Sequence, residues 1–157
     1  MDNPVVTACA AMIALLQRTR SASVTIDGRR IAETATGMLA LVGFTREDDE
    51  ARLERFIERM LNYRMFADGN GRMNRSLRDI GGELLMVPQF TLAADTNSGN
   101  RPSFTPAAAP EKGRMLFEAL EKRMKQAWPN TAFGVFGADM HVELVNDGPV
   151  TFWIEVN

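Results

Sequence analysis

The chain has 157 residues, of which 45% are hydrophobic and 24% are charged, and its formal net charge is −2. This length and composition are typical of one globular domain, and the chain contains no internal repeat or low-complexity stretch. It has no apolar run long enough to predict a transmembrane helix, and its start lacks the basic residues of a secretory signal. With Cys9 as its only cysteine, it cannot form an intrachain disulfide. We therefore expect a cytoplasmic protein with no membrane partner.

The first half of the chain predicts a β-rich segment followed by one helix. Asp27 and Gly28 both tolerate positive φ, so they predict a tight hairpin turn. Apolar residues at helical spacing, preceded by Asp48, Asp49 and Glu50 at the positive end, predict a helix. In chain order, the expected elements are strands at 12–16, 21–26, 30–34 and 37–42, a helix at 48–63 and a small hairpin at 64–74.

The second half predicts one central strand, a long loop, a helix and three closing strands. The segment 83–89 is apolar on both faces, which indicates a strand inside a sheet. The loop at 93–109 is long for a compact domain, and such loops are usually functional or disordered. The remaining expected elements are a helix at 110–128 and strands at 132–136, 140–146 and 150–156. Many strands with two main helices predict an α+β domain in which a helical layer packs on sheet.

The chain offers few side chains for acid–base or metal chemistry. His141 is the only histidine, and it alternates with Val142 and Leu144 along a predicted strand, so we expect it to face away from the core. Metal sites usually combine several His and Cys ligands, which this sequence cannot supply. The Gly69-Asn70-Gly71 segment is a turn and not a phosphate-binding loop. We therefore expect no metal and no cofactor.

The charge pattern favours at most a local contact with nucleic acid. A net charge of −2 and a pI of about 5.5 argue against extensive binding of a phosphate backbone. A local basic patch remains possible from eight arginines, namely Arg18, Arg20, Arg29, Arg30, Arg72, Arg75, Arg78 and Arg101.

Three segments carry a resemblance to a known family: Pro88-Gln89-Phe90-Thr91-Leu92, Gly99-Asn100-Arg101-Pro102-Ser103-Phe104 and Asn146-Asp147-Gly148-Pro149-Val150-Thr151. Together they resemble the signature of the D-aminoacyl-tRNA deacylases, which cut the ester between a D-amino acid or glycine and tRNA. The resemblance implies a β-β-α layered fold with mostly antiparallel sheets and two main helices, acting as a homodimer without a cofactor. It begins at Met12, so we expect an N-terminal extension at 1–11 and a single deacylase domain at 12–157.

The resemblance assigns the catalytic pocket to the first segment. It places Gln89, Phe90 and Thr91 at the terminal adenosine and the scissile ester. An aminoacyl ester is already activated and has a neighbouring ribose 2′-hydroxyl. Backbone N–H groups that stabilise the oxyanion, together with that hydroxyl, would therefore suffice without a catalytic histidine.

The resemblance assigns substrate binding and chiral selection to the last segment. In the family the Gly148-Pro149 peptide is cis and enters the partner subunit's pocket, where its carbonyl oxygens hold the substrate's α-amino group and an L-side chain collides with the backbone. Asn146 and Thr151 hold this segment, and Arg18 supports it. On its own, an Asp-Gly-Pro sequence is more typical of a simple tight turn.

Two positions depart from the family pattern. Pro88 stands where the family usually has Ser, and Val135 stands where Arg is common in the Gly134-Val135-Phe136 segment. Loss of that basic group could alter the preference among tRNAs. Pro88 leaves open whether the chain only binds aminoacyl ends.

The resulting hypothesis is hydrolysis of D-aminoacyl-tRNA, and of glycine mischarged on tRNA, with the aminoacyl-tRNA acceptor end as partner and no role for DNA. A non-hydrolytic module of the same fold, which binds amino acids or aminoacyl ends, is the main alternative. An accessory editing domain that acts beside a synthetase is a second alternative, although no linker or further domain is seen.

Overall fold

The computed structural model describes residues 11–157, so the expected extension at 1–11 lies outside the described residues except for Ala11. Ala11 is buried, and its N–H donates to Thr45 Oγ1 at 3.0 Å. The chain is therefore already packed one residue before the predicted start of the domain. In the described part, no helix is long and apolar enough to cross a membrane.

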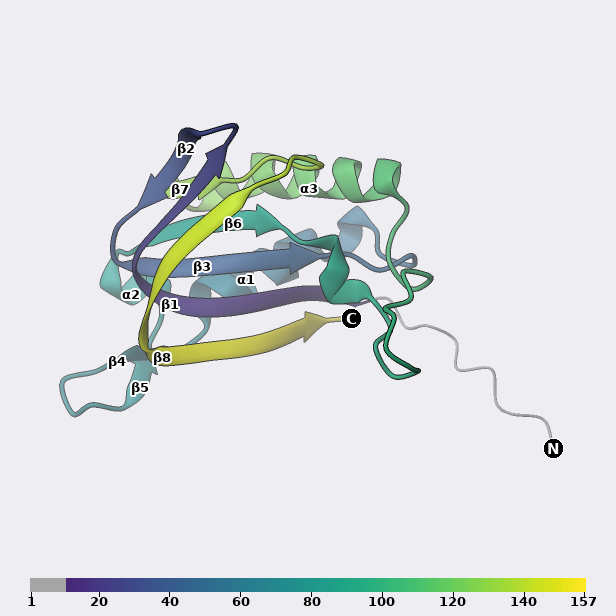
Figure 1. Ribbon diagram of the computed structural model, residues 1–157. Coiled ribbons are helices and arrows are strands. Elements are labelled where there is room, and N and C mark those ends of the chain that lie inside the picture. The colour runs from purple at the N-terminus through teal and green to yellow at the C-terminus, as the bar shows by residue number, and fades with distance from the viewer. Residues whose placement is uncertain (1–10) are drawn as a thin grey trace.

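One mixed sheet forms the centre of the fold (Figure 1). Its strands are β1 (Met12–Ile26), β2 (Arg29–Thr34), β3 (Gly37–Gly43), β6 (Glu83–Pro88), β7 (Thr131–Phe133) and β8 (His141–Val156). The order is β2-β1-β3-β6-β7, and β8 pairs along nearly all of β1. Pairs that include β1 are antiparallel, whereas β6 runs parallel to both β3 and β7. As predicted, the buried segment at 83–89 is a central strand.

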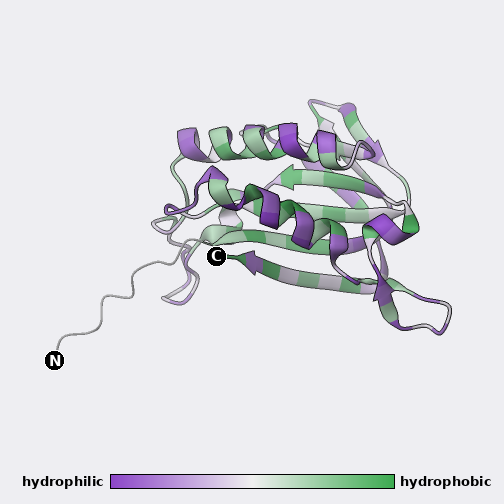
Figure 2. Cartoon of the chain, turned by 180° about the vertical axis from the view of Figure 1, so that it is seen from behind, coloured by the Kyte–Doolittle hydropathy of each residue, from purple (hydrophilic) through white to green (hydrophobic). Residues whose placement is uncertain are grey.

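The sheet folds over itself, and helices cover its outer side. The first half of β1 pairs with β3, and its second half pairs with β2. An apolar cluster that includes Val24, Leu39 and Val87 fills the space between the two sheet layers. A larger cluster lies between the sheet and two helices, α1 (Leu53–Asn62) and α3 (Pro110–Ala127), which Figure 2 shows in front of the sheet. The predicted α+β class with β-β-α layers and two main helices is confirmed.

Bulges in β1 and β8 allow each of these strands to place side chains in both apolar clusters. Thr19 pairs with Asn146 and Gln17 pairs with Thr151, so β8 carries three more residues than β1 in this interval. On the other side of Thr19, β1 carries one extra residue. An odd number of extra residues reverses the facing of all later side chains in a strand. Even-numbered residues of both strands therefore face the helices at one end and the opposite sheet layer at the other.

Several predicted boundaries were wrong. The segments 12–16 and 21–26 form one continuous strand, β1, and 140–146 and 150–156 are likewise parts of one strand, β8. The sequence break at Gly148-Pro149 does not end β8, because pairing with β1 continues on both sides of the bulge.

The predicted helix at 48–63 begins later. A 3₁₀ turn at Glu50–Arg52 precedes α1, and Asp49 caps it by accepting from the N–H of Ala51. Asp48 is not part of a helix: it is buried, and its Oδ2 accepts from the N–H and the hydroxyl of Thr45.

The predicted small hairpin is present as β4 (Phe66–Ala67) and β5 (Met73–Arg75). A short helix that was not predicted, α2 (Leu77–Ile80), follows it. A reciprocal capping box between Ser76 and Asp79 starts α2, and Gly81 ends it in the left-handed conformation with φ 62°.

Candidate active site

The first signature segment forms the sharp end of a central strand. β6 ends at Pro88, the N–H of Gln89 donates to the carbonyl of Val42 at 2.7 Å, and a 3₁₀ turn, η2 (Phe90–Ala93), begins at once. Within residues 11–157, the N–H groups of Phe90 and Thr91 have no hydrogen-bond acceptor, because they are the first donors of the turn. The Gln89 amide donates to Thr91 Oγ1 at 2.5 Å. Two adjacent N–H donors are thus available beside a fixed hydroxyl.

Phe90 lies on the surface of this turn and not in the core. Its side chain is 55% exposed and packs against Phe104, with ring centroids 5.3 Å apart. The loop that carries Phe104 folds back because Asp95 and Ser103 exchange two backbone hydrogen bonds at 2.8 and 2.9 Å. The first two signature segments are therefore brought together. Beside them a cavity of about 540 Å³ is lined by Thr91 and the following residues together with Ile13 and Trp153.

Pro88 fits the strand end, because its missing N–H removes no hydrogen bond to β3. Because Gln89 donates to β3, the backbone nitrogen of residue 88 points to the opposite side, where β7 already ends at its pair with Met86. The two departures from the family pattern are also neighbours in space. A Cβ on Gly134 would lie 3.3 Å from Pro88 Cδ, and Val135 follows directly with 47% of its surface exposed.

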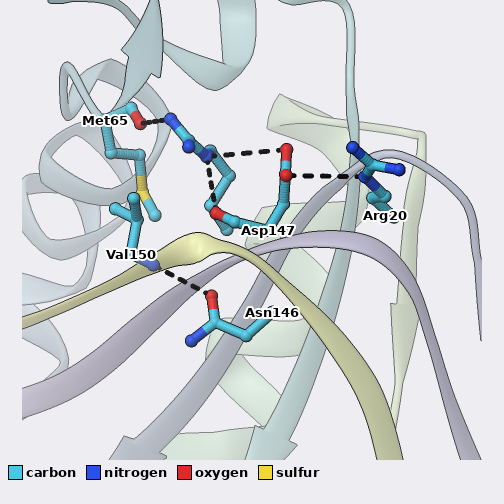
Figure 3. A network of polar contacts seen from close by, with 6 residues as sticks. Arg20, Met65, Asn146, Asp147 and Val150 are labelled. Carbon is cyan, nitrogen blue, oxygen red and sulfur yellow. Dashed lines mark hydrogen bonds and ion pairs between the residues drawn. The ribbon is translucent and has the colours of Figure 1, made fainter.

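The third signature segment lies in the bulge of β8, and Figure 3 shows its residues Asn146, Asp147 and Val150 with polar contacts that hold them. The Arg18 guanidinium donates to the carbonyl of Asp147 at 2.9 Å and to the carbonyl of Met65 at 3.2 Å. Only 17% of the Arg18 side chain is exposed. Arg20 pairs with the other side of Asp147, at 3.4 Å to Oδ1, but is 74% exposed. Arg18 is therefore the internal support of the segment and Arg20 a surface neighbour.

Asn146 and Thr151 close the bulge at its base. Asn146 accepts from the N–H of Val150 at 3.1 Å and donates to Thr151 Oγ1 at 3.0 Å. Between them the Gly148-Pro149 peptide is cis, as the resemblance implied, and Gly148 has φ 131°. A Cβ on Gly148 would lie 2.7 Å from Val150 Cγ2, so glycine is required by the local packing as well as by φ. Gly148 and Pro149 are both exposed.

Within one chain, the two halves of the predicted site are at opposite ends of the sheet (Figure 1). Arg18 on β1 lies beside the bulge. Ala14, four residues earlier on β1, pairs with Val42 of β3, and Val42 pairs in turn with Pro88 of β6. Four residues along a strand span about 13 Å, and the three strand spacings from β8 to β6 span about 14 Å. Gly148-Pro149 and Phe90 are therefore about 20 Å apart on this geometry, too far to act on one ester bond.

Titratable groups with altered pKa values lie elsewhere. Burial raises the pKa of Asp48, whereas hydrogen bonds from Asn74 and Ser76 lower the pKa of Asp68 and Asp79, respectively. His141 is exposed, as predicted, and Cys9 lies outside the described residues. In residues 11–157, no three His, Cys, Asp or Glu side chains gather as metal ligands would.

Comparisons with known proteins agree with this fold and show the family to which the chain belongs. The family model described as D-Tyr-tRNA(Tyr) deacylase matches residues 15–155. A D-aminoacyl-tRNA deacylase of Alkalilimnicola ehrlichii is 56% identical, covering 92% of this chain and 96% of the relative. One of Thioalkalivibrio sulfidiphilus is 57% identical, covering 92% and 97%.

Two solved structures are also similar. One, titled c-Myc DNA Unwinding Element Binding Protein, has a TM-score of 0.88 and 34% identity, covering 92% of this chain and 99% of that one. Another, titled a probable eukaryotic D-amino acid tRNA deacylase, has a TM-score of 0.81 and 16% identity, covering 93% and 100%, and supports the fold alone. The fold is thus that of the D-amino acid tRNA deacylases. The chain belongs to the D-aminoacyl-tRNA deacylase family and is an ester hydrolase of that kind.

Proposed function

We propose that the chain hydrolyses D-aminoacyl-tRNA, and glycine mischarged on tRNA, at the turn that follows β6. The observation that carries this proposal is the pair of N–H groups on Phe90 and Thr91, which have no acceptor within residues 11–157. Such donors stabilise the oxyanion that forms when water attacks an ester, and one donor contributes about 3–4 kcal/mol. The ribose 2′-hydroxyl of the substrate then assists the water, and no protein base is needed.

The terminal adenosine lies against the aromatic pair in this proposal. Phe90 and Phe104 are both about half exposed and present an apolar surface on which a base can stack. The cavity beside Thr91 has a volume suited to a small ligand. Gln89 positions the Thr91 hydroxyl through its amide. The acceptor end of tRNA is therefore the expected partner, in the cytoplasm, with no DNA or membrane involved.

Chiral selection requires a second copy of the chain. Gly148-Pro149 is about 20 Å from Phe90 within one chain, yet it is exposed and held rigidly by Arg18 and Asn146. In a homodimer, each copy inserts this segment into the pocket of the other. Its carbonyls accept from the substrate's α-amino group, and its backbone leaves no room for an L-side chain.

The activity is tested by incubating purified protein with D-Tyr-tRNA, L-Tyr-tRNA and Gly-tRNA, with and without a strong chelator. We expect release of D-tyrosine and glycine, survival of L-Tyr-tRNA and no effect of the chelator. Equal cleavage of both tyrosyl substrates would contradict the chiral site. Tight binding of all three without turnover would favour the non-hydrolytic binding module.

The shared site is tested by pairing two defective subunits. Phe90→Ala and Gly148→Val each damage one half of the site. A heterodimer of the two has one pocket with both defects and one pocket with neither, so we expect about half of the wild-type rate. If both halves came from the same chain, every pocket of the heterodimer would be defective and no activity would return.

A further inference from the structure

The β4–β5 hairpin is a rigid, basic projection beside the Gly148-Pro149 segment, and the function proposed above gives it no role. Figure 1 shows it extending from the body of the protein next to the bend of β8. Residues 64–75 contain three arginines and one aspartate, a net charge of +2 in a chain whose overall charge is −2. Positive charge is thus concentrated here against the sign of the whole molecule.

The single acid of the hairpin is used internally and does not neutralise the arginines. Asp68 accepts from the N–H groups of Asn70 and Arg72, at 2.8 and 3.0 Å, and from the Asn74 amide at 2.8 Å. These bonds lower the pKa of Asp68 and fix the turn at the tip. The tip therefore holds its shape without a ligand, which reduces the ordering cost of binding.

The arginines are exposed and largely free of ion pairs. Arg64, Arg72 and Arg75 are all exposed, and none forms an ion pair with any residue of the described range 11–157. Arg75 donates to the carbonyl of Asp79 at 3.0 Å, which orients its guanidinium. Met73 is 44% exposed on the same strand. Three exposed cations on one projection match the phosphate groups of an RNA backbone.

One guanidinium links this hairpin to the segment that enters the partner's pocket. Arg18 donates to the carbonyl of Met65, directly before β4, and to the carbonyl of Asp147, directly before Gly148. The base of the hairpin and the Gly148-Pro149 segment are therefore held in a fixed relative position. In the dimer proposed above, the hairpin lies beside the segment that enters the pocket of the other subunit.

Resting on the proposed function, we propose that the β4–β5 hairpin binds the phosphate backbone of the tRNA acceptor stem whose 3′ end occupies the partner's pocket. Each subunit then contributes a pocket to one tRNA and both a Gly148-Pro149 segment and a basic hairpin to the other. The hairpin reads the presence of an RNA stem and not its sequence, because its contacts are to phosphates.

The test compares two double variants that remove the same charge. Arg72→Gln/Arg75→Gln alters the β4–β5 hairpin, and Arg29→Gln/Arg30→Gln alters the exposed turn end of the β1–β2 hairpin. Hydrolysis of D-Tyr-tRNA is measured over a range of salt concentrations, beside hydrolysis of D-tyrosyl-adenosine. Equilibrium binding of uncharged tRNA is measured for the same proteins.

We expect Arg72→Gln/Arg75→Gln to lower kcat/KM for D-Tyr-tRNA about tenfold and to reduce the slope of log kcat/KM against log salt by about 1 for each lost phosphate contact. D-tyrosyl-adenosine, which has no stem, is cleaved at the wild-type rate. The β1–β2 variant behaves as wild type. Unchanged tRNA kinetics, or an equal loss on both substrates or in both variants, would overturn the proposal.

The binding measurement separates this proposal from the proposed function. If wild-type protein cleaves neither substrate, the proposed function fails, but uncharged tRNA binding still decides the role of the hairpin. Weaker tRNA binding by Arg72→Gln/Arg75→Gln alone supports the hairpin contact. Equal tRNA binding by wild type and this variant refutes it.

Discussion

Replacement of Arg18 by lysine tests whether one guanidinium positions the segment that selects the substrate. Lysine keeps the charge but has a single nitrogen, so it cannot reach both the Asp147 and the Met65 carbonyl as Arg18 does, at 2.9 and 3.2 Å. Loss of one charge-assisted hydrogen bond at this largely buried position should lower the free energy of unfolding by about 1.5–3 kcal/mol. A segment displaced by about 1 Å should lower kcat/KM for D-Tyr-tRNA by about 10- to 100-fold.

Arg20→Lys is the matched control, because Arg20 lies on the same strand and pairs with the same aspartate but is 74% exposed. An exposed ion pair contributes at most about 1 kcal/mol, and lysine preserves it, so stability and kcat/KM should stay close to wild type. The assays are urea unfolding and the ratio of kcat/KM for D-Tyr-tRNA and L-Tyr-tRNA. Only loss of positioning lowers this ratio. An Arg18→Lys enzyme with wild-type rate and ratio, or equal losses in both variants, would refute the reasoning.

Three further predictions concern single positions. Pro88→Ser should change kcat/KM less than tenfold, under about 1.4 kcal/mol, because the Pro88 nitrogen lies beyond the last residue pair of β6 with β7. An inactive wild type that regains hydrolysis through Pro88→Ser would instead indicate a binding module. Gly148→Ala should reduce both activity and melting temperature, since its Cβ meets Val150 at 2.7 Å, whereas Gly28→Ala, with φ 75° and open space, should lower only the melting temperature. Burial raises the pKa of Asp48, so the folded state binds the proton more tightly than the unfolded state. The free energy of unfolding of wild type, relative to that of Asp48→Asn, should therefore rise as pH falls from neutral toward 3.8. Urea titrations at several pH values measure this difference, and a fall would contradict the burial argument.

The strands and the two long helices could be predicted because each repeats its pattern several times. Leu53, Phe56 and Ile57 recur at helical spacing, and all three are buried in the core. The helix α2 has one turn and no such repeat, so only its caps could have disclosed it. Ser76 and Asp79 stand at the spacing of a capping box, and this signal was missed.

The site residues could be named from the sequence, but their arrangement could not. Nothing local indicates that Phe104 packs on Phe90, since their contact depends on a loop folding back through Asp95 and Ser103. Equally, Gly148-Pro149 looks like the end of a strand, because a cis or turn-forming Pro is unusual inside a sheet. Only long-range pairing of β8 with β1 on both sides turns that interruption into a bulge.

The bulge in β8 also restricts how this protein can change during evolution. Between Asn146 and Thr151 the strand carries three residues more than its partner, and this odd excess sends Val142 and Leu144 into one core and Phe152 and Ile154 into the other. Deletion or insertion of one residue here would turn every apolar side chain on one side of the bulge to the wrong face. Evolution can therefore substitute residues in this segment, whereas a change of its length by one residue would prevent correct folding. Any lineage that alters the length of this segment must do so in steps of two residues.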